Sequence, residues 1–153
     1  MSYRGHQLLA REAVRAHRAV EAEQHLARAY ALYPRDRQTL ISYSELLLDQ
    51  GRPVESAHFA RQLMLHSDQR TERGAVTLYL ESTGRAWGAD SVLAAGRRLF
   101  ATSPSATAAL FIGLAQETRG DTAGALASYR QGLRVAPTDS ALIARAAVLA
   151  TRG

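Results

Sequence analysis

The sequence contains no cysteine, lysine or asparagine, and only one of its 153 residues is tryptophan. The lack of cysteine excludes disulfide bonds, thiolate nucleophiles and zinc sites built on thiolates. It leaves the redox compartment undetermined. All 19 cationic side chains are arginines. Because lysine and asparagine are both encoded by A-rich codons, their joint absence is typical of a GC-rich, bacterial genome.

Long hydrophobic runs are also missing. No stretch of 18 or more apolar residues exists, so hydropathy predicts no membrane insertion. Residues 1–18 are rich in arginine and lack the apolar core of a signal peptide. The localisation is therefore unassigned: the protein is cytoplasmic, or periplasmic if a leader was removed.

The net charge is +5, but the positive charge is spread along the chain. Residues 1–40 carry seven arginines against four acids, and residues 106–153 carry five against three. There is no basic run, and no aromatic residues alternate with arginine as a base-stacking surface needs. These features argue against nucleic acid as the partner.

What the chain does contain is a period of about 34 residues. Terminators of helices recur at spacings of 34, about 35 and 34 residues, namely at Pro34, Ser67–Asp68, Ser103–Pro104 and Pro137. A glycine lies midway in three of the intervals, at Gly51, Gly84 and Gly120, where a left-handed residue would end the first helix of a hairpin. Residues that start helices follow the turns or terminators, at Asp36, Pro53, Asp90, Ser105, Asp121 and Thr138–Ser140.

Apolar residues within each interval recur at steps of three and four, as in Leu40, Tyr43 and Leu47, which predicts helices and not strands. Small residues recur where two helices of a hairpin must pack closely, for example at Gly113 and Ala125. The chain is therefore expected to form tandem helical hairpins.

The last full interval resembles a tetratricopeptide repeat most clearly, through Ala109, Ile112, Gly113, Gln116, Ala125, Tyr129 and Pro137. The resemblance implies an all-α fold, a right-handed superhelix or α-solenoid, formed by residues 1–153 as one domain. It implies four repeats at about 3–36, 37–70, 71–105 and 106–139, followed by a helix at 140–152. The third repeat departs from the family pattern, because Thr83–Ala89 reads as an unusually long turn between its helices.

The helix at 140–152 is apolar for a terminal cap, which should present a polar outer face. Either it is a cap, or it is the first helix of a further repeat whose turn begins at Gly153. Its apolar residues, Leu142 and Leu149 among them, would then form an interface or allow self-association.

In proteins of this family the first helices line a concave groove, so the exposed faces of these helices are the expected partner-binding surface. The predicted groove residues are Arg4, Gln7, Arg11, Arg15, Gln38, Ser42, Glu45, Asp49, Leu110 and Leu114. An alternative interpretation is that Arg11 and Arg15 form surface ion pairs with Glu45 and Asp49. Trp87, in the supposed long turn, is either an exposed interface residue or a filler between helices.

No catalytic, phosphate-binding or metal-binding motif is present, and the five histidines do not form one. We therefore expect no enzyme, no cofactor, no metal and no small-molecule substrate. The resemblance implies a protein-interaction scaffold that binds a peptide or helix of a partner, as in bacterial secretion, pilus or polysaccharide-export assembly. The alternatives are an RNA-binding helical repeat, or a repeat segment of a larger enzyme or envelope protein.

Overall fold

The computed structural model describes residues 1–152, and Gly153 lies outside the described residues. Within 1–152 the regular structure is entirely helical. The elements are α1 (Tyr3–Arg15), α2 (Ala19–Leu32), α3 (Arg37–Asp49), α4 (Pro53–Leu63), the 3₁₀ helix η1 (Ser67–Gln69), α5 (Arg73–Trp87), α6 (Ala89–Thr102), α7 (Ala106–Thr118), α8 (Thr122–Val135) and α9 (Ser140–Ala150). None of the described helices is both long enough and apolar enough to cross a membrane.

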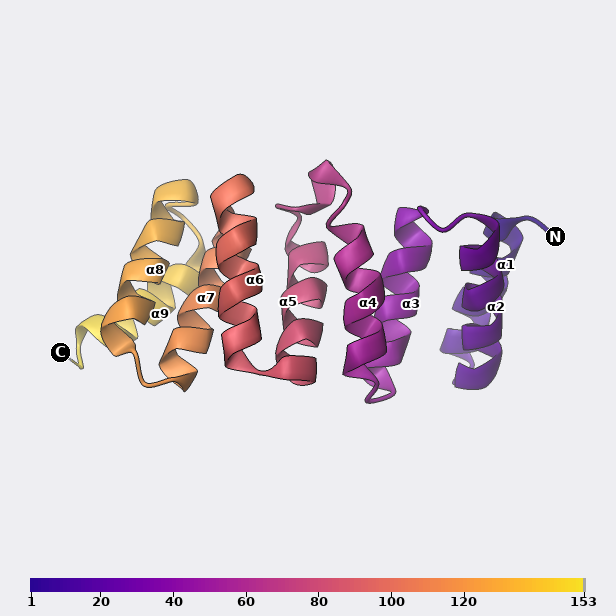
Figure 1. Ribbon diagram of the computed structural model, residues 1–153, viewed down its shortest axis with the longest axis horizontal. Coiled ribbons are helices and arrows are strands. Elements are labelled where there is room, and N and C mark those ends of the chain that lie inside the picture. Colours follow the sequence, from indigo (N-terminus) through magenta and orange to yellow (C-terminus); the bar gives the residue numbers. More distant parts are fainter. Residues whose placement is uncertain (153) are drawn as a thin grey trace.

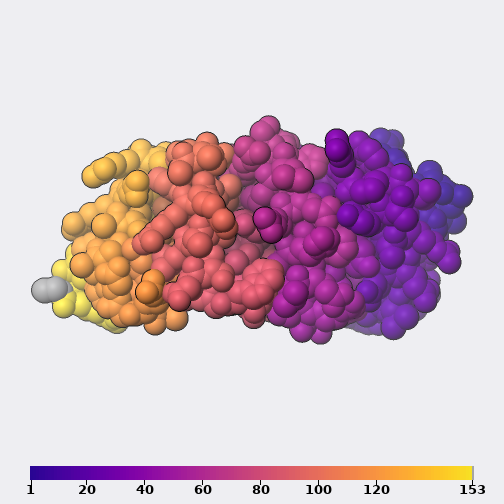
Figure 2. Space-filling view, in the orientation of Figure 1, coloured from indigo at the N-terminus to yellow at the C-terminus, as the bar shows by residue number. Residues whose placement is uncertain are grey.

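The helices form hairpins that stack in a row, with the two chain termini at opposite ends (Figure 1). The hairpins are α1–α2, α3–α4, α5–α6 and α7–α8, and α9 packs on the last of them. We call α1, α3, α5, α7 and α9 the first helices, and α2, α4, α6 and α8 the second helices. The second helices lie toward the viewer in Figure 1, and side chains make the surface continuous along the row in Figure 2.

Every first helix begins with a side chain that caps its free backbone amides. Asp36, Ser105 and Asp139 do so as the sequence predicts, accepting hydrogen bonds from the amides of Thr39, Ala108 and Leu142 at 2.7, 3.1 and 3.0 Å. Ser2 and Glu72 cap α1 and α5 in the same way. Local capping chemistry therefore fixes where each hairpin starts.

The turn in the third hairpin differs from the predicted one. Gly51 and Gly120 take the expected left-handed conformation, with φ of 72° and 78°, but in the third hairpin that residue is Gly88, with φ of 86°. Helix α5 continues through Thr83 to Trp87, so the long irregular turn expected there does not exist. Gly84 lies inside α5, where an added Cβ would be 3.0 Å from Cγ2 of Val92 on α6. The glycine at 84 serves close helix packing instead of ending the helix.

Small residues bring the helices of each hairpin into close contact. An added Cβ on Gly113 would lie only 2.1 Å from Cε1 of Tyr129, so the tyrosine ring rests directly on the backbone of α7. Tyr129 is fully buried, and its hydroxyl donates a hydrogen bond to Glu117. In the second hairpin, the Ser56 hydroxyl donates to the Ser44 carbonyl at 2.7 Å, and the two hydroxyls lie 2.9 Å apart.

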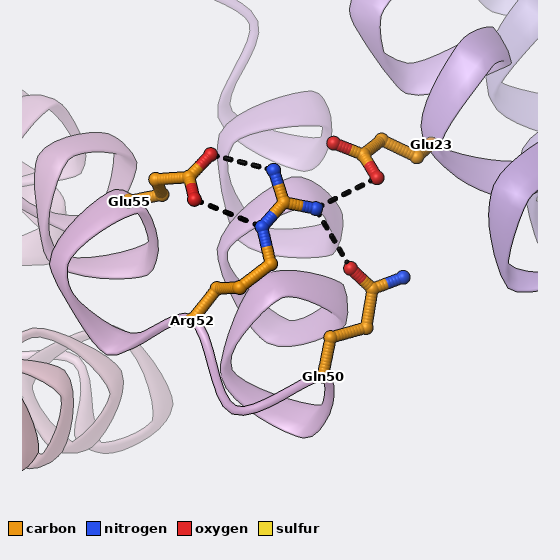
Figure 3. Close-up of polar contacts among 4 residues, drawn as sticks. All are labelled: Glu23, Gln50, Arg52 and Glu55. Atoms are coloured by element: carbon orange, nitrogen blue, oxygen red, sulfur yellow. Dashed lines mark hydrogen bonds and ion pairs between the residues drawn. The ribbon is translucent and has the colours of Figure 1, made fainter.

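An arginine in the α3–α4 turn ties the first two hairpins together (Figure 3). The guanidinium of Arg52 donates to both carboxylate oxygens of Glu55, at 2.9 and 2.6 Å, and to Glu23 of α2 at 2.8 Å. It also donates to the side-chain oxygen of Gln50 at 2.9 Å. The pKa of Glu55 is lowered because its carboxylate accepts these bonds from a cation. The turn is thus held against the neighbouring hairpin by a forked contact that lysine would not reproduce.

Replacing Gly113 with leucine should lower the free energy of unfolding by about 1–3 kcal/mol, because the new side chain would collide with the buried ring of Tyr129. Urea unfolding followed by circular dichroism measures the change. Ala127→Leu, at an exposed position of α8, is the matched control and should have little effect. Equal stability of Gly113→Leu and the wild type would show that α7 and α8 do not pack as described.

Candidate functional site

A groove with a volume of about 590 Å³ lies between α1 and α3. Its lining comes almost wholly from these two first helices. Those of the predicted residues that line it are Arg4, Gln7, Arg11, Gln38, Ser42, Glu45 and Asp49. Arg15 is exposed on α1 but does not line the groove. The helical period thus brings seven residues from two helices to one concavity.

The floor of the groove is apolar and partly open to solvent. Leu8 and Val14 of α1 line it and are 60% and 48% exposed. Ala10, Leu26 and Leu46 line it as well and are buried, as parts of the core between the first two hairpins. Exposed aliphatic side chains beside buried ones provide a surface from which a bound partner would displace water.

Charges of opposite sign flank this floor without pairing across it. The expected ion pairs of Arg11 and Arg15 with Glu45 and Asp49 are absent from the ion pairs among residues 1–152, so that structural interpretation is wrong. The α1 side carries Arg4 and Arg11, and the α3 side carries Glu45 and Asp49. The groove is therefore basic along one wall and acidic along the other.

The environment of Glu45 disfavours the charged form of its carboxyl group. The pKa of its carboxyl is raised, first because the surrounding protein removes water and second because Asp49 brings a like charge one helical turn away. Such a carboxyl gains when a cationic group approaches. The acidic wall thus favours a basic group on a ligand.

The neutral polar residues of the groove have structural partners. Gln7 donates to the hydroxyl of Thr39 at 2.7 Å and to the capping carboxylate of Asp36, which links α1 to the start of α3. Gln38 donates to the hydroxyl of Ser42 at 3.1 Å along the surface of α3. Gln7 therefore positions the two walls. Arg4 donates to the hydroxyl of Tyr3 at 3.2 Å, whereas Arg11, Glu45 and Asp49 form no ion pair among residues 1–152.

A second groove of about 500 Å³ extends the surface from α3 to α5. It shares Glu45 and Asp49 with the first groove. Its α5 residues include Thr77, Glu81 and Arg85, which the sequence interpretation missed. The sequence places a turn at Gly84, so it does not predict that α5 continues to Trp87. The spacing of four between Glu81 and Arg85, which form an ion pair at 2.7 Å, was the available signal that the helix continues.

Three other predicted residues lie outside both grooves. Leu110 and Leu114 are half-buried on α7, and Leu110 packs against the core formed with α8 and α9. Trp87, the last residue of α5, is 56% exposed, so it does not fill a gap between helices. Its role as an interface residue stays a prediction.

Leu142 and Leu149, which the sequence analysis gives as possible interface residues, are not exposed for such a contact. They are 0% and 4% exposed, because α9 turns them onto the core that contains Ala125 and Tyr129. The outer face of α9 instead shows Ile143 and Val148, which are 48% and 45% exposed. Self-association through α9 stays a prediction and now rests on these two side chains.

The fold brings together two histidines that lie 19 residues apart. Nδ1 of His6 on α1 and Nδ1 of His25 on α2 are 3.1 Å apart, so one ring donates a hydrogen bond to the other. His6 is buried, and its pKa is lowered by burial and then by the neighbouring charges of His25, Arg28 and the N-terminal amine. Among residues 1–152, no group of three histidine, cysteine or acidic side chains is arranged as a metal site.

Comparison with known proteins finds similar structures but no similar sequences. No protein-family model matches the chain, and no curated protein matches it. Among solved structures, the MamA protein superposes with a TM-score of 0.72 at 14% identity, covering 96% of this chain and 80% of that chain. A thermophilic tetratricopeptide-repeat protein of Thermus thermophilus gives 0.63 at 18% identity, covering 99% and 82%.

A tetratricopeptide-repeat protein from Parabacteroides merdae gives a TM-score of 0.74 at 16% identity, covering 96% of this chain and 58% of that chain. Identities this low establish the fold alone. The resemblance that the sequence predicts is confirmed at that level: the chain has the all-α tetratricopeptide-repeat fold.

Glu45→Gln should stabilise the protein at neutral pH. Folding raises the pKa of this carboxyl, so the folded state holds its proton more tightly than the unfolded state does. The carboxyl therefore lowers the folding stability as pH rises from the unfolded-state pKa toward the folded-state pKa, and it has little effect below both. The variant should therefore melt at a higher temperature than the wild type near pH 7 and at a similar temperature near pH 4. Glu12→Gln, an exposed acid on α1, is the control. A lower melting temperature for Glu45→Gln at pH 7 would mean that the Glu45 charge is favourably paired.

His6 should make the first hairpin sensitive to acid. Folding lowers the pKa of His6 from 6.5, so the folded state favours the neutral imidazole. The contribution of His6 to folding stability is therefore complete above pH 6.5 and is lost as pH falls through the folded-state pKa. Thermal melts between about pH 7.5 and pH 5 should show a smaller acid-induced loss in His6→Gln than in the wild type. His17→Gln, which changes an exposed histidine, should behave like the wild type. An identical pH dependence in all three proteins would contradict this account of the histidine pair.

Proposed function

We propose that this chain, with its tetratricopeptide-repeat fold, is a protein-interaction scaffold that holds a peptide or helix of a partner protein in the groove between α1 and α3. The observation that carries the proposal is the open apolar floor at Leu8 and Val14 between uncompensated charges of opposite sign. Binding without catalysis is the proposed role.

The two walls set the polarity of the partner segment. Arg4 and Arg11 on the α1 wall would receive acidic side chains, and Glu45 and Asp49 on the α3 wall would receive basic ones. Apolar side chains between them would cover Leu8 and Val14. An amphipathic helix with an acidic and a basic flank meets these three requirements at once. Electrostatic complementarity of this kind fixes the orientation of a partner and speeds its association.

The acidic wall disfavours the RNA-binding alternative for this groove. Glu45 and Asp49 also line the second groove, where Glu81 is paired with Arg85. A phosphodiester chain that follows the two grooves would pass the carboxylates of Glu45 and Asp49, which form no ion pair among residues 1–152, and would be repelled by them. A protein partner uses both signs of charge, so we prefer it.

Family analogy extends the proposal to a pathway. Bacterial secretion, pilus and polysaccharide-export machineries are the setting that the sequence resemblance suggests, and a scaffold with one polar-flanked groove suits the assembly of such machines. Whether the chain serves there alone or as a segment of a larger enzyme or envelope protein does not alter the groove proposed to do the binding.

Selection of peptides tests the groove directly. A phage-displayed library of about 20-residue helical peptides, selected on the wild type, should yield peptides with an apolar stripe between an acidic and a basic flank. Affinity, measured by fluorescence anisotropy, should fall about tenfold or more in Arg4→Glu/Arg11→Glu and in Glu45→Arg/Asp49→Arg. Peptides with the matching flank reversed in charge should regain affinity for the corresponding variant.

The control for these variants is Arg130→Glu/Arg134→Glu. It changes the net charge by the same amount as the first groove variant, but it lies on exposed positions of α8. Peptide binding to it should equal binding to the wild type. If selected peptides bind all of the variants equally well, the groove is not the site of binding.

A further inference from the structure

The carboxyl ends of the second helices lie along one edge of the molecule. Helices α2, α4, α6 and α8 run in the same direction, and their last turns follow the upper edge of the row in Figure 1. We call this the carboxyl edge and define it by the second halves of these four helices and the residues that directly follow them. Residues near the carboxyl ends of the four second helices therefore lie along one edge of the molecule.

Arginine is the charged residue placed there. The second halves of the second helices carry six exposed arginines and no acid, namely Arg28, Arg61, Arg97, Arg98, Arg130 and Arg134. None of these six takes part in an ion pair among residues 1–152. The acids of the second helices lie near their amino ends, where Glu23, Glu55 and Asp90 pair with Arg52 and Arg119.

The loops beside this edge do not neutralise it. Their acids are Asp36, Asp68, Glu72 and Asp139, each of which caps a helix or pairs with Arg37 or Arg73. An equal number of arginines lies in these loops or at the helix starts that follow them, at positions 35, 37, 70 and 73. The six arginines of the carboxyl edge are therefore a net positive charge.

Stabilisation of helix ends explains only part of this pattern. Cations in the last turn interact favourably with the helix dipole, and Arg61 and Arg134 occupy that turn. The dipole effect falls off within one turn, and no basic residue lies in the last turns of α2 and α6. Arg28, Arg97, Arg98 and Arg130 therefore need another reason.

Exposed aliphatic side chains accompany the arginines. Leu32 ends α2, Val135 ends α8 and Leu65 follows α4, and they are 56%, 45% and 76% exposed. One such side chain on a surface is ordinary, but three at equivalent ends of parallel helices form a recurring feature. They place apolar tips next to the positive charges along the same edge.

We propose that the carboxyl edge binds the surface of a membrane that contains anionic lipids. Lipid phosphates attract the arginines, and aliphatic tips gain by entering the boundary between headgroups and acyl chains. A nucleic acid would use the charge but not the tips, because Leu32, Leu65 and Val135 cannot stack on bases. One aromatic ring lies nearby: Tyr33 contacts the ring of Tyr3, with centroids 5.3 Å apart, and is 48% exposed.

Flotation with lipid vesicles tests the proposal. The full chain should bind vesicles of about 70% phosphatidylcholine and 30% phosphatidylglycerol, should bind pure phosphatidylcholine at least tenfold less, and should weaken as salt rises from about 50 to 300 mM. The variant Arg97→Glu/Arg98→Glu/Arg130→Glu should lose at least tenfold in partition to the anionic vesicles. Leu32→Ser/Leu65→Ser should lose several-fold at unchanged net charge.

The matched control is Arg15→Glu/Arg18→Glu/Arg152→Glu, which makes the same change in net charge at exposed positions at the α1–α2 turn and after α9. Its vesicle binding should stay within about threefold of the wild type, with unchanged helicity in all variants. An equal loss in this control would overturn the proposal, because overall charge alone would then account for binding. Binding to random duplex DNA that depends on the edge arginines, together with no effect of the two serine substitutions, would also overturn it.

Discussion

The row of hairpins depends on how closely the two helices of each hairpin approach one another. Glycine at 113 lets the ring of Tyr129 rest on the backbone of α7, and the Ser44–Ser56 contact lets α3 and α4 approach while both buried hydroxyls stay hydrogen-bonded. Each hairpin then offers a defined surface to the next one. Because a repeat contacts mainly its neighbours, a change in one crossing alters the spacing of the adjoining first helices. The spacing of α1 and α3 therefore depends on the crossings within the first two hairpins, and not on the crossing of α7 and α8.

Most of the fold could be read from the sequence because local chemistry sets the helix ends. Asp36, Ser105 and Asp139 cap helices whatever surrounds them, and Gly51 and Gly120 take a conformation that other residues adopt at a cost. The third hairpin was misread because it contains two candidate glycines four residues apart. Gly84 fits the repeat period better, but the helix gains another turn by continuing to Gly88. The period alone does not reveal which glycine is needed for helix packing and which for the turn.

The site was predictable to the extent that it depends on helical periodicity. A step of three or four residues places Arg4 and Arg11 on one face of α1, and Glu45 and Asp49 on one face of α3. Pairing across the groove depends on the separation of the two helices, which no pattern within a helix encodes, and the ion pairs expected there do not form. The contact between His6 and His25 depends on the same kind of information, namely the rotation of α1 against α2.

The two charged surfaces differ in how they relate to stability. In the groove, Glu45 keeps a carboxylate whose pKa is raised by partial loss of water and by the like charge of Asp49, although the residue is exposed at the surface. At the carboxyl edge, the codon usage that the composition suggests would account for the choice of arginine over lysine, but not for the positions of the arginines. Codon usage acts on every arginine equally, whereas the six at the edge have no acid in the same halves of their helices, and Arg52 and Arg119 in the turns are paired with acids. Position, and not composition, is therefore the feature that calls for a partner.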